Sequence, residues 1–110
     1  MKRKGRAYMA KPDLEKVYAG DKNSIISAML CEASFYRMNG IVEAVKHGFK
    51  EPAIVRQIQN LTTDNTGTLT LTGGYTVSDF ALAALHVLGI EAYGGNKENV
   101  RAIIDSKFGF

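Results

Sequence analysis

The sequence is poor in several residue types that usually mark particular classes of protein. Its 110 residues include one cysteine, two prolines and no tryptophan. A single cysteine excludes an intramolecular disulfide framework and a cysteine-based structural zinc site. No apolar run approaches the ~18 residues that span a bilayer, and the basic start is not followed by the apolar region of a signal peptide. We therefore expect a single cytoplasmic domain over 1–110, without a membrane anchor.

An excess of positive charge is also lacking outside the first few residues. The chain has 14 basic and 11 acidic residues, which gives a formal net charge of +3. Four of the basic residues lie within the first six positions: Lys2, Arg3, Lys4 and Arg6. Without them, the remainder of the chain is slightly acidic. A basic end can contact phosphates or anionic lipid, but a solvated tail is the simpler explanation. We interpret 1–10 as a flexible basic tail.

The dominant pattern along the chain is helical. In most segments between turn residues, apolar side chains recur at the three- and four-residue spacing of an amphipathic helix. The first predicted helices run from Pro12 to Gly20, from Asn23 or Ser24 to Asn39-Gly40, and over 41–48. Later helices are predicted over 52–61, from Thr76 or Ser78 to Gly89, and from Asn96 onward. These segments indicate an all-α fold.

One stretch of different composition interrupts the helical pattern. Residues 62–76 contain seven threonines, three glycines and no basic residue. Within this stretch, Thr68-Leu69-Thr70-Leu71-Thr72 alternates with the period of a strand, and turn residues flank it on both sides. The pattern fits either a Thr-rich loop or a small β-hairpin over about 62–76, and the sequence leaves both open.

A short motif occurs twice, as Val55-Arg56-Gln57-Ile58 and again as Val100-Arg101-Ala102-Ile103. Each copy follows a more apolar segment that contains alanines, and the spacing lies within the ~40–47 residues of paired-helix repeats. Residues 24–108 therefore resemble two HEAT-type repeats. Ser78–Gly89 is similar to the first helix of such a unit, and Val100–Asp105 is similar to the second. The resemblance implies a short superhelix of helical hairpins, with the Thr-rich segment projecting between the units.

The same resemblance implies a non-enzymatic protein-binding or scaffold module, because helical solenoids bind partners through an exposed grooved surface. The candidate surface residues are Arg56, Gln59, Asn60, Arg101 and Asp105. The two arginines could equally pack their stems on a neighbouring helix with their head groups in water. Two units are fewer than the about three that an independent solenoid needs, so self-association is also expected. The identity of the protein partner is not readable from the sequence.

No set of residues predicts catalysis, a metal site or a cofactor. Cys31 is predicted to lie within an apolar helix as a small buried side chain. His47 and His86 have no further ligand nearby at metal-binding spacing, and His47 is predicted near a helix C-terminus, where an imidazolium is favourable. The glycine pairs at 73–74 and 94–95 lack the Lys-Ser/Thr pair of a phosphate-binding loop. We therefore predict neither an enzyme nor a cofactor.

A winged helix-turn-helix DNA-binding protein is the alternative interpretation. The order of helices followed by a hairpin matches that fold, with 52–61 as the recognition helix and 63–75 as the wing. This helix holds residue types that read base edges: Arg56, Gln57, Gln59 and Asn60. The predicted wing, however, contains no lysine or arginine, and the chain beyond its basic start lacks the positive face of a DNA-binding domain. The sequence therefore favours the protein-binding interpretation.

Overall fold

The computed structural model describes residues 12–66, 74–90 and 97–106, and these ranges contain helices and no β-strand. The helices are α1 (Leu14–Tyr18), α2 (Lys22–Met29), α3 (Ser34–Lys46), α4 (Pro52–Asn60), the 3-10 helix η1 (Leu61–Thr63), α5 (Val77–Val87) and α6 (Lys97–Ser106). The all-α prediction is thus confirmed for the described residues. Among these helices, none is both long and apolar enough to cross a bilayer.

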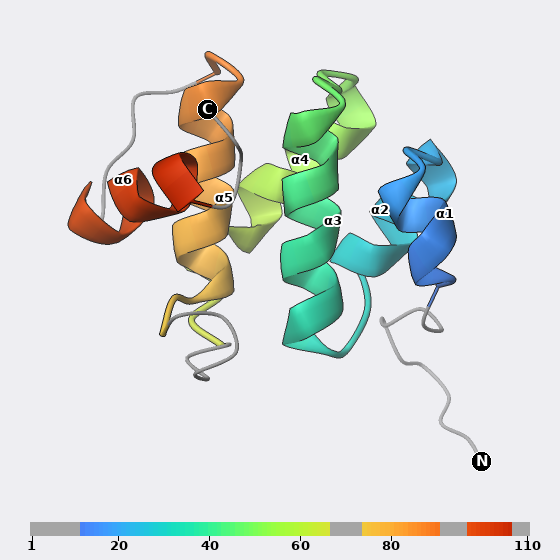
Figure 1. The fold of residues 1–110 in the computed structure, drawn as a ribbon, viewed down its shortest axis with the longest axis horizontal. Helices are drawn as coiled ribbons and strands as arrows, with labels where there is room; N and C mark the ends of the chain where they lie inside the picture. The colour runs from blue at the N-terminus through green and yellow to red at the C-terminus, as the bar shows by residue number, and fades with distance from the viewer. Residues whose placement is uncertain (1–11, 67–73, 91–96, 107–110) are drawn as a thin grey trace.

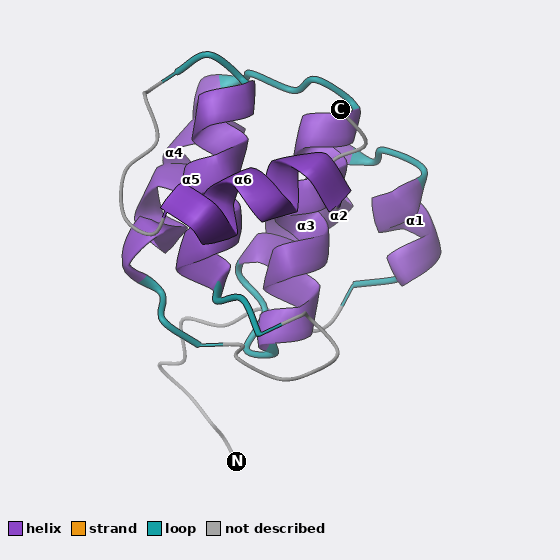
Figure 2. Ribbon diagram, turned by 60° about the vertical axis from the view of Figure 1, so that its left-hand side comes forward, coloured by secondary structure: helices purple, strands orange, loops and turns teal. Residues whose placement is uncertain are grey.

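Helix α5 lies at the centre of the packing. It contacts α3, α4, η1 and α6, whereas α2 packs mainly on α3 and the short α1 packs on α2 and α3. In Figure 1, α6 crosses in front of α5, and α4 passes behind α3. The turned view in Figure 2 again places α6 and α4 on different sides of α5. The two copies of the recurring motif therefore do not lie in one layer, and a HEAT-type superhelix is not confirmed.

The apolar stripes predicted from the sequence supply most of the core. The buried residues of these stripes are Val17, Met29, Ile54, Ile58, Leu61, Val77, Phe80, Ala81, Ala84, Leu85, Leu88, Val100 and Ile103. Ile104 is only partly buried against this core. The predicted start of the last helix at Asn96 lies outside the described residues.

Side-chain caps explain where α2 and α5 begin. Thr76 Oγ1 accepts a hydrogen bond from the backbone N–H of Asp79 at 3.1 Å, and Asp79 Oδ2 accepts one from the backbone N–H of Thr76 at 3.1 Å. This capping box confirms the predicted start of α5. At α2, the carboxylate of Asp21 accepts from the backbone N–H of Ser24 at 3.0 Å. The helix consequently begins before the predicted cap at Asn23 or Ser24.

The prediction that a central helix ends at Asn39-Gly40 is wrong. The chain leaves the helical conformation after Met29 and enters it again at Ser34, and α3 then continues through Asn39 and Gly40. Helix α3 therefore combines the second half of the predicted central helix with the separate helix predicted over 41–48.

Gly40 serves close helix packing and does not end a helix. A Cβ atom at this position would lie 2.8 Å from Cγ of Met29 and 3.0 Å from the backbone oxygen of Ile25. Carbon atoms do not approach a carbon or an oxygen so closely without displacing it, so only glycine lets α3 cross α2 at this separation. The sequence alone does not distinguish this use of glycine from a helix C-cap, because both place glycine beside apolar residues.

The Thr-rich segment predicted over 62–76 lies only partly within the described residues, as 67–73 are not described. Its two ends lie side by side: the backbone N–H of Val77 donates to the carbonyl of Thr66 at 2.9 Å, and that of Ser78 donates to the carbonyl of Asp64 at 2.6 Å. The predicted hairpin or wing and the predicted basic tail over 1–10 fall outside the described residues.

We expect Gly40→Ala to lower the free energy of unfolding by about 1–3 kcal/mol, as overpacking of a core does. The sign of this change is informative, because replacing a glycine by alanine in a helix without a close neighbour stabilises the helix by about 1 kcal/mol. Urea denaturation followed by circular dichroism measures the change. An increase in stability would contradict the close crossing of α2 and α3.

Candidate functional site

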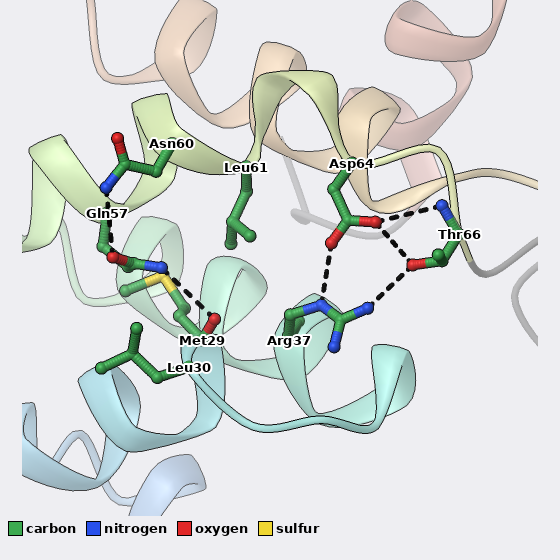
Figure 3. Close-up of a pocket in the computed structure, with 8 residues that line it drawn as sticks. All are labelled: Met29, Leu30, Arg37, Gln57, Asn60, Leu61, Asp64 and Thr66. Carbon is green, nitrogen blue, oxygen red and sulfur yellow. Dashed lines mark hydrogen bonds and ion pairs between the residues drawn. The ribbon is translucent and has the colours of Figure 1, made fainter. Parts of the chain in front are cut away.

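A groove of about 310 Å³ opens between the C-terminal end of α2 and α4. Figure 3 shows the eight residues that line it: Met29, Leu30, Arg37, Gln57, Asn60, Leu61, Asp64 and Thr66. They come from the end of α2, the start of α3, the α4–η1 segment and the residues that follow η1. The groove thus lies where four parts of the chain meet, although α2 and α4 are more than 20 residues apart in sequence.

A buried guanidinium forms one side of this groove. Arg37, near the start of α3, is 7% exposed. Its Nε donates to Oδ2 of Asp64 at 2.9 Å, and its Nη2 donates to Oγ1 of Thr66 at 2.8 Å. Its Nη1 donates to the backbone oxygens of Cys31 and Glu32 at 2.7 and 2.8 Å. One side chain therefore holds the α2–α3 connection against the residues that follow η1.

The carboxylate of Asp64 is fully engaged by its neighbours. Partial burial raises the pKa of Asp64, but hydrogen bonds from Thr66 and the charge and hydrogen bond of Arg37 together hold it below its usual value of 3.8. Oδ1 of Asp64 accepts from the backbone N–H and the hydroxyl of Thr66 at 3.1 and 2.6 Å. The Thr66 hydroxyl thus donates to Asp64 while it accepts from Arg37. The two charges of the groove neutralise each other.

The same residues also anchor the start of α5. Besides the backbone bonds from Val77 and Ser78, Oγ of Ser78 donates to the backbone oxygen of Thr62 at 2.5 Å. Arg37 therefore joins the α2–α3 connection to the segment after η1, and backbone hydrogen bonds join that segment to the first turn of α5. We call Arg37, Asp64 and Thr66 the arginine network.

The α4 wall of the groove is polar and uncharged. Nε2 of Gln57 lies 3.5 Å from the backbone oxygen of Met29, and Nδ2 of Asn60 lies 3.4 Å from Oε1 of Gln57. Both bonds are longer than the ~2.9–3.0 Å that is usual for N–H···O bonds. Met29 ends α2, where helix carbonyls lack intrahelical partners. Leu30 and Leu61 add apolar surface beside these amides.

The structure brings the residues predicted to form a binding surface together only in part. All five are exposed: Arg56, Gln59, Asn60, Arg101 and Asp105. Asn60 lines the groove beside α4, and Gln57, which was not among the five predicted surface residues, lines it as well. Arg56 and Gln59 belong to the same helix but are not among the lining residues.

Arg101 and Asp105 lie elsewhere, with His86 and Ile104 around a smaller recess of about 230 Å³ between α5 and α6. Arg56, Gln59 and Asn60 thus belong to α4, and Arg101 and Asp105 belong to α6, and the two views place these helices on different sides of α5. The recess also unites two residues of the predicted surface with His86, which was assigned no role from the sequence.

The arginine network is not predicted by any pattern in the sequence. Arg37 lies in a segment predicted to be helical, and Asp64 lies in the Thr-rich segment 62–76. The turn at Asp64 and Thr66 has a recognisable sequence, since aspartate and threonine favour such local hydrogen bonds. Nothing in the sequence pairs Arg37 with a residue 27 positions away.

Cys31 and His47, which the sequence analysis considered for chemistry, do not line the groove or the recess. Cys31 is 1% exposed, as expected, but it lies in the α2–α3 connection and not within a helix. His47 follows the end of α3 as predicted, with Nε2 at 3.6 Å from Oε1 of Glu43 and 3.4 Å from the backbone oxygen of Tyr18. The described residues contain no group of three or more His, Cys, Asp or Glu side chains placed to hold a metal ion.

Comparison with protein-family models, with curated proteins and with solved structures found no match for this chain. What the groove can do is therefore inferred from its own geometry. It offers amide donors and acceptors, apolar side chains and a neutralised ion pair.

We expect Arg37→Met to lower the free energy of unfolding by about 3–5 kcal/mol, because it leaves the partly buried carboxylate of Asp64 without its counter-ion. Arg56→Met is the matched control: this exposed residue of α4 should change the free energy by no more than about 0.5 kcal/mol. Urea denaturation of both variants gives the comparison. Equal effects in the two variants would show that the arginine network does not stabilise the fold.

The stability of the fold should also depend on Asp64 in acid. Because folding holds the pKa of Asp64 below 3.8, the ionised carboxylate stabilises the fold above that pH, and this stabilisation is lost as the pH falls through the folded-state pKa. Asp21 and Glu51 contribute in the same range, since Ser24 and Lys22 respectively lower the pKa of their carboxyls.

The test of this dependence is the difference between two proteins. Below about pH 4, the unfolding free energy of the unmodified protein should fall more steeply with decreasing pH than that of Asp64→Asn. Denaturation midpoints measured over a pH series give both slopes. Identical slopes would exclude a stabilising role of the ionised Asp64.

Proposed function

We propose that the protein is a non-enzymatic module that binds another protein through the groove beside α4. The lining of this groove is the observation that supports the proposal: side-chain amides and apolar groups surround an ion pair whose charges cancel. Protein interfaces commonly combine apolar contact with a few hydrogen bonds and few unpaired charges at their centre. The one carboxylate in the lining is already bound by Arg37 and Thr66, so it is poorly suited to act as a general base.

DNA binding by α4 is the second candidate. It is supported by the exposed positions of Arg56, Gln59 and Asn60 on one helix. Two observations weigh against it. The described residues contain more acidic than basic side chains, whereas duplex binding depends on cationic contacts to phosphates. In addition, Gln57 is directed toward the carbonyl of Met29 and into the groove, away from where a base edge would be read.

Two expectations from the HEAT-type resemblance also remain proposals, namely stacking of repeats and self-association. A stack would require an apolar end face that a second copy could cover. The large apolar side chains that are exposed, Tyr18, Phe35 and Ile90, belong to three different parts of the described chain. The proposed binding at the α4 groove depends on neither expectation.

Selection of a phage-displayed library of linear random peptides on the immobilised protein tests the proposed function. We expect the recovered peptides to share a sequence and to bind with Kd values of roughly micromolar size, as is usual for transient contacts of small area. Isothermal titration calorimetry measures the affinity of synthetic copies.

Electrophoretic mobility shifts with duplex DNA at two salt concentrations provide the opposing test. DNA binding that weakens steeply with salt and survives deletion of residues 1–6 would favour the second candidate. Such binding, together with the absence of any shared peptide sequence, would overturn the proposal that the protein binds other proteins.

A further inference from the structure

We infer that the groove beside α4 takes an extended, uncharged peptide segment. In this inference, the peptide backbone pairs with the side-chain amides of Gln57 and Asn60, and one apolar side chain of the peptide is held near Leu30 and Leu61. The inference rests on the proposed function and names the class of partner. It follows from three properties of the groove: its exchangeable amides, its electrical neutrality and its rigid support.

The amides are placed to exchange their present bonds for bonds to a ligand. Figure 3 shows Gln57 and Asn60 on one wall, with their hydrogen bonds running along it toward Met29. These bonds measure 3.4 and 3.5 Å, against 2.7 to 2.9 Å for the bonds of Arg37. Giving up long bonds loses little free energy. A peptide group offers one donor and one acceptor, which match the two functions of a side-chain amide.

The charge of the groove restricts the side chains that it accepts. Within the described lining, the ionisable side chains are Arg37 and Asp64, and they neutralise each other at 2.9 Å. A charged side chain that enters would lose water and gain no counter-ion, which is unfavourable. An apolar side chain would instead gain contact with Leu30 and Leu61. The occupant is therefore neutral at the position that enters the groove.

The size and support of the groove fit a peptide better than a compact small molecule. Its volume of about 310 Å³ lies at the lower limit of the ~300–1,000 Å³ usual for small-molecule pockets, and it is partly open to solvent. The arginine network holds its side of the groove in place through short hydrogen bonds. Because this side of the groove is already ordered, binding loses less conformational entropy.

The test uses peptides from the library selection and a matched pair of variants, Gln57→Glu and Gln59→Glu. Both exchange the same residue type on α4, but Gln57 lines the groove and Gln59 does not. We expect Gln57→Glu to weaken binding of an uncharged selected peptide by about tenfold or more, the effect of one lost hydrogen bond with added charge. The affinity of Gln59→Glu should change by less than about twofold, within the range of surface substitutions.

A second variant keeps the test valid if Gln57→Glu destabilises the fold. Asn60→Asp changes the shape of the side chain hardly at all but removes a donor and adds a charge at the same wall. It should weaken peptide binding by about tenfold as well. Thermal melts of all variants establish that the folded proteins are compared, and backbone amide shifts in NMR locate the bound peptide.

The outcomes separate this inference from the proposed function. Selected peptides that share charged residues, or that shift signals around His86, Arg101 and Asp105 instead of those around Gln57, would overturn the inference and leave protein binding intact. Tighter binding of adenosine monophosphate than of any selected peptide at the groove would also overturn it, since an adenine edge offers a similar donor and acceptor. The absence of any shared peptide sequence would contradict both.

Discussion

The arrangement of the α4 groove depends on the guanidinium of Arg37. This buried group donates hydrogen bonds to two backbone carbonyls of the α2–α3 connection. It also donates to the side chains of Asp64 and Thr66 in the segment after η1. A buried charge is tolerated only when it is paired and its donors are satisfied. Arg37 meets both conditions at one point, and it thereby joins segments that apolar packing alone would bring together without fixed register.

Close packing of α2 on α3 is the second constraint. Because Gly40 has no Cβ atom, the side chain of Met29 and the backbone of Ile25 lie closer to α3 than they could with any other residue at position 40. This crossing sets the direction in which α2 ends, and its last residue presents a carbonyl to Gln57 on α4. The core and the groove are therefore consequences of the same packing.

The proposed binding of a neutral peptide follows from the contrast between the two sides of the groove. One side is held by short, charged hydrogen bonds, and the other consists of amides with long bonds that a ligand can replace. A rigid side gives the ligand a defined shape to fit, and an adaptable side allows the polar groups of the ligand to find partners. Stability and recognition are thus assigned to different residues of one groove.

Local patterns in the sequence determined the helical class, the apolar stripe of α4, the capping box at Thr76 and the buried face of α5, because each depends on residues within a few positions of one another. The tertiary structure alone decided three other matters: the use of Gly40 for helix crossing, the pairing of Arg37 with Asp64, and the placement of α4 and α6 on different sides of α5. The physical reason is common to all three. Contacts between residues far apart in sequence depend on how the helices pack. A single sequence does not indicate which of these side chains will be in contact.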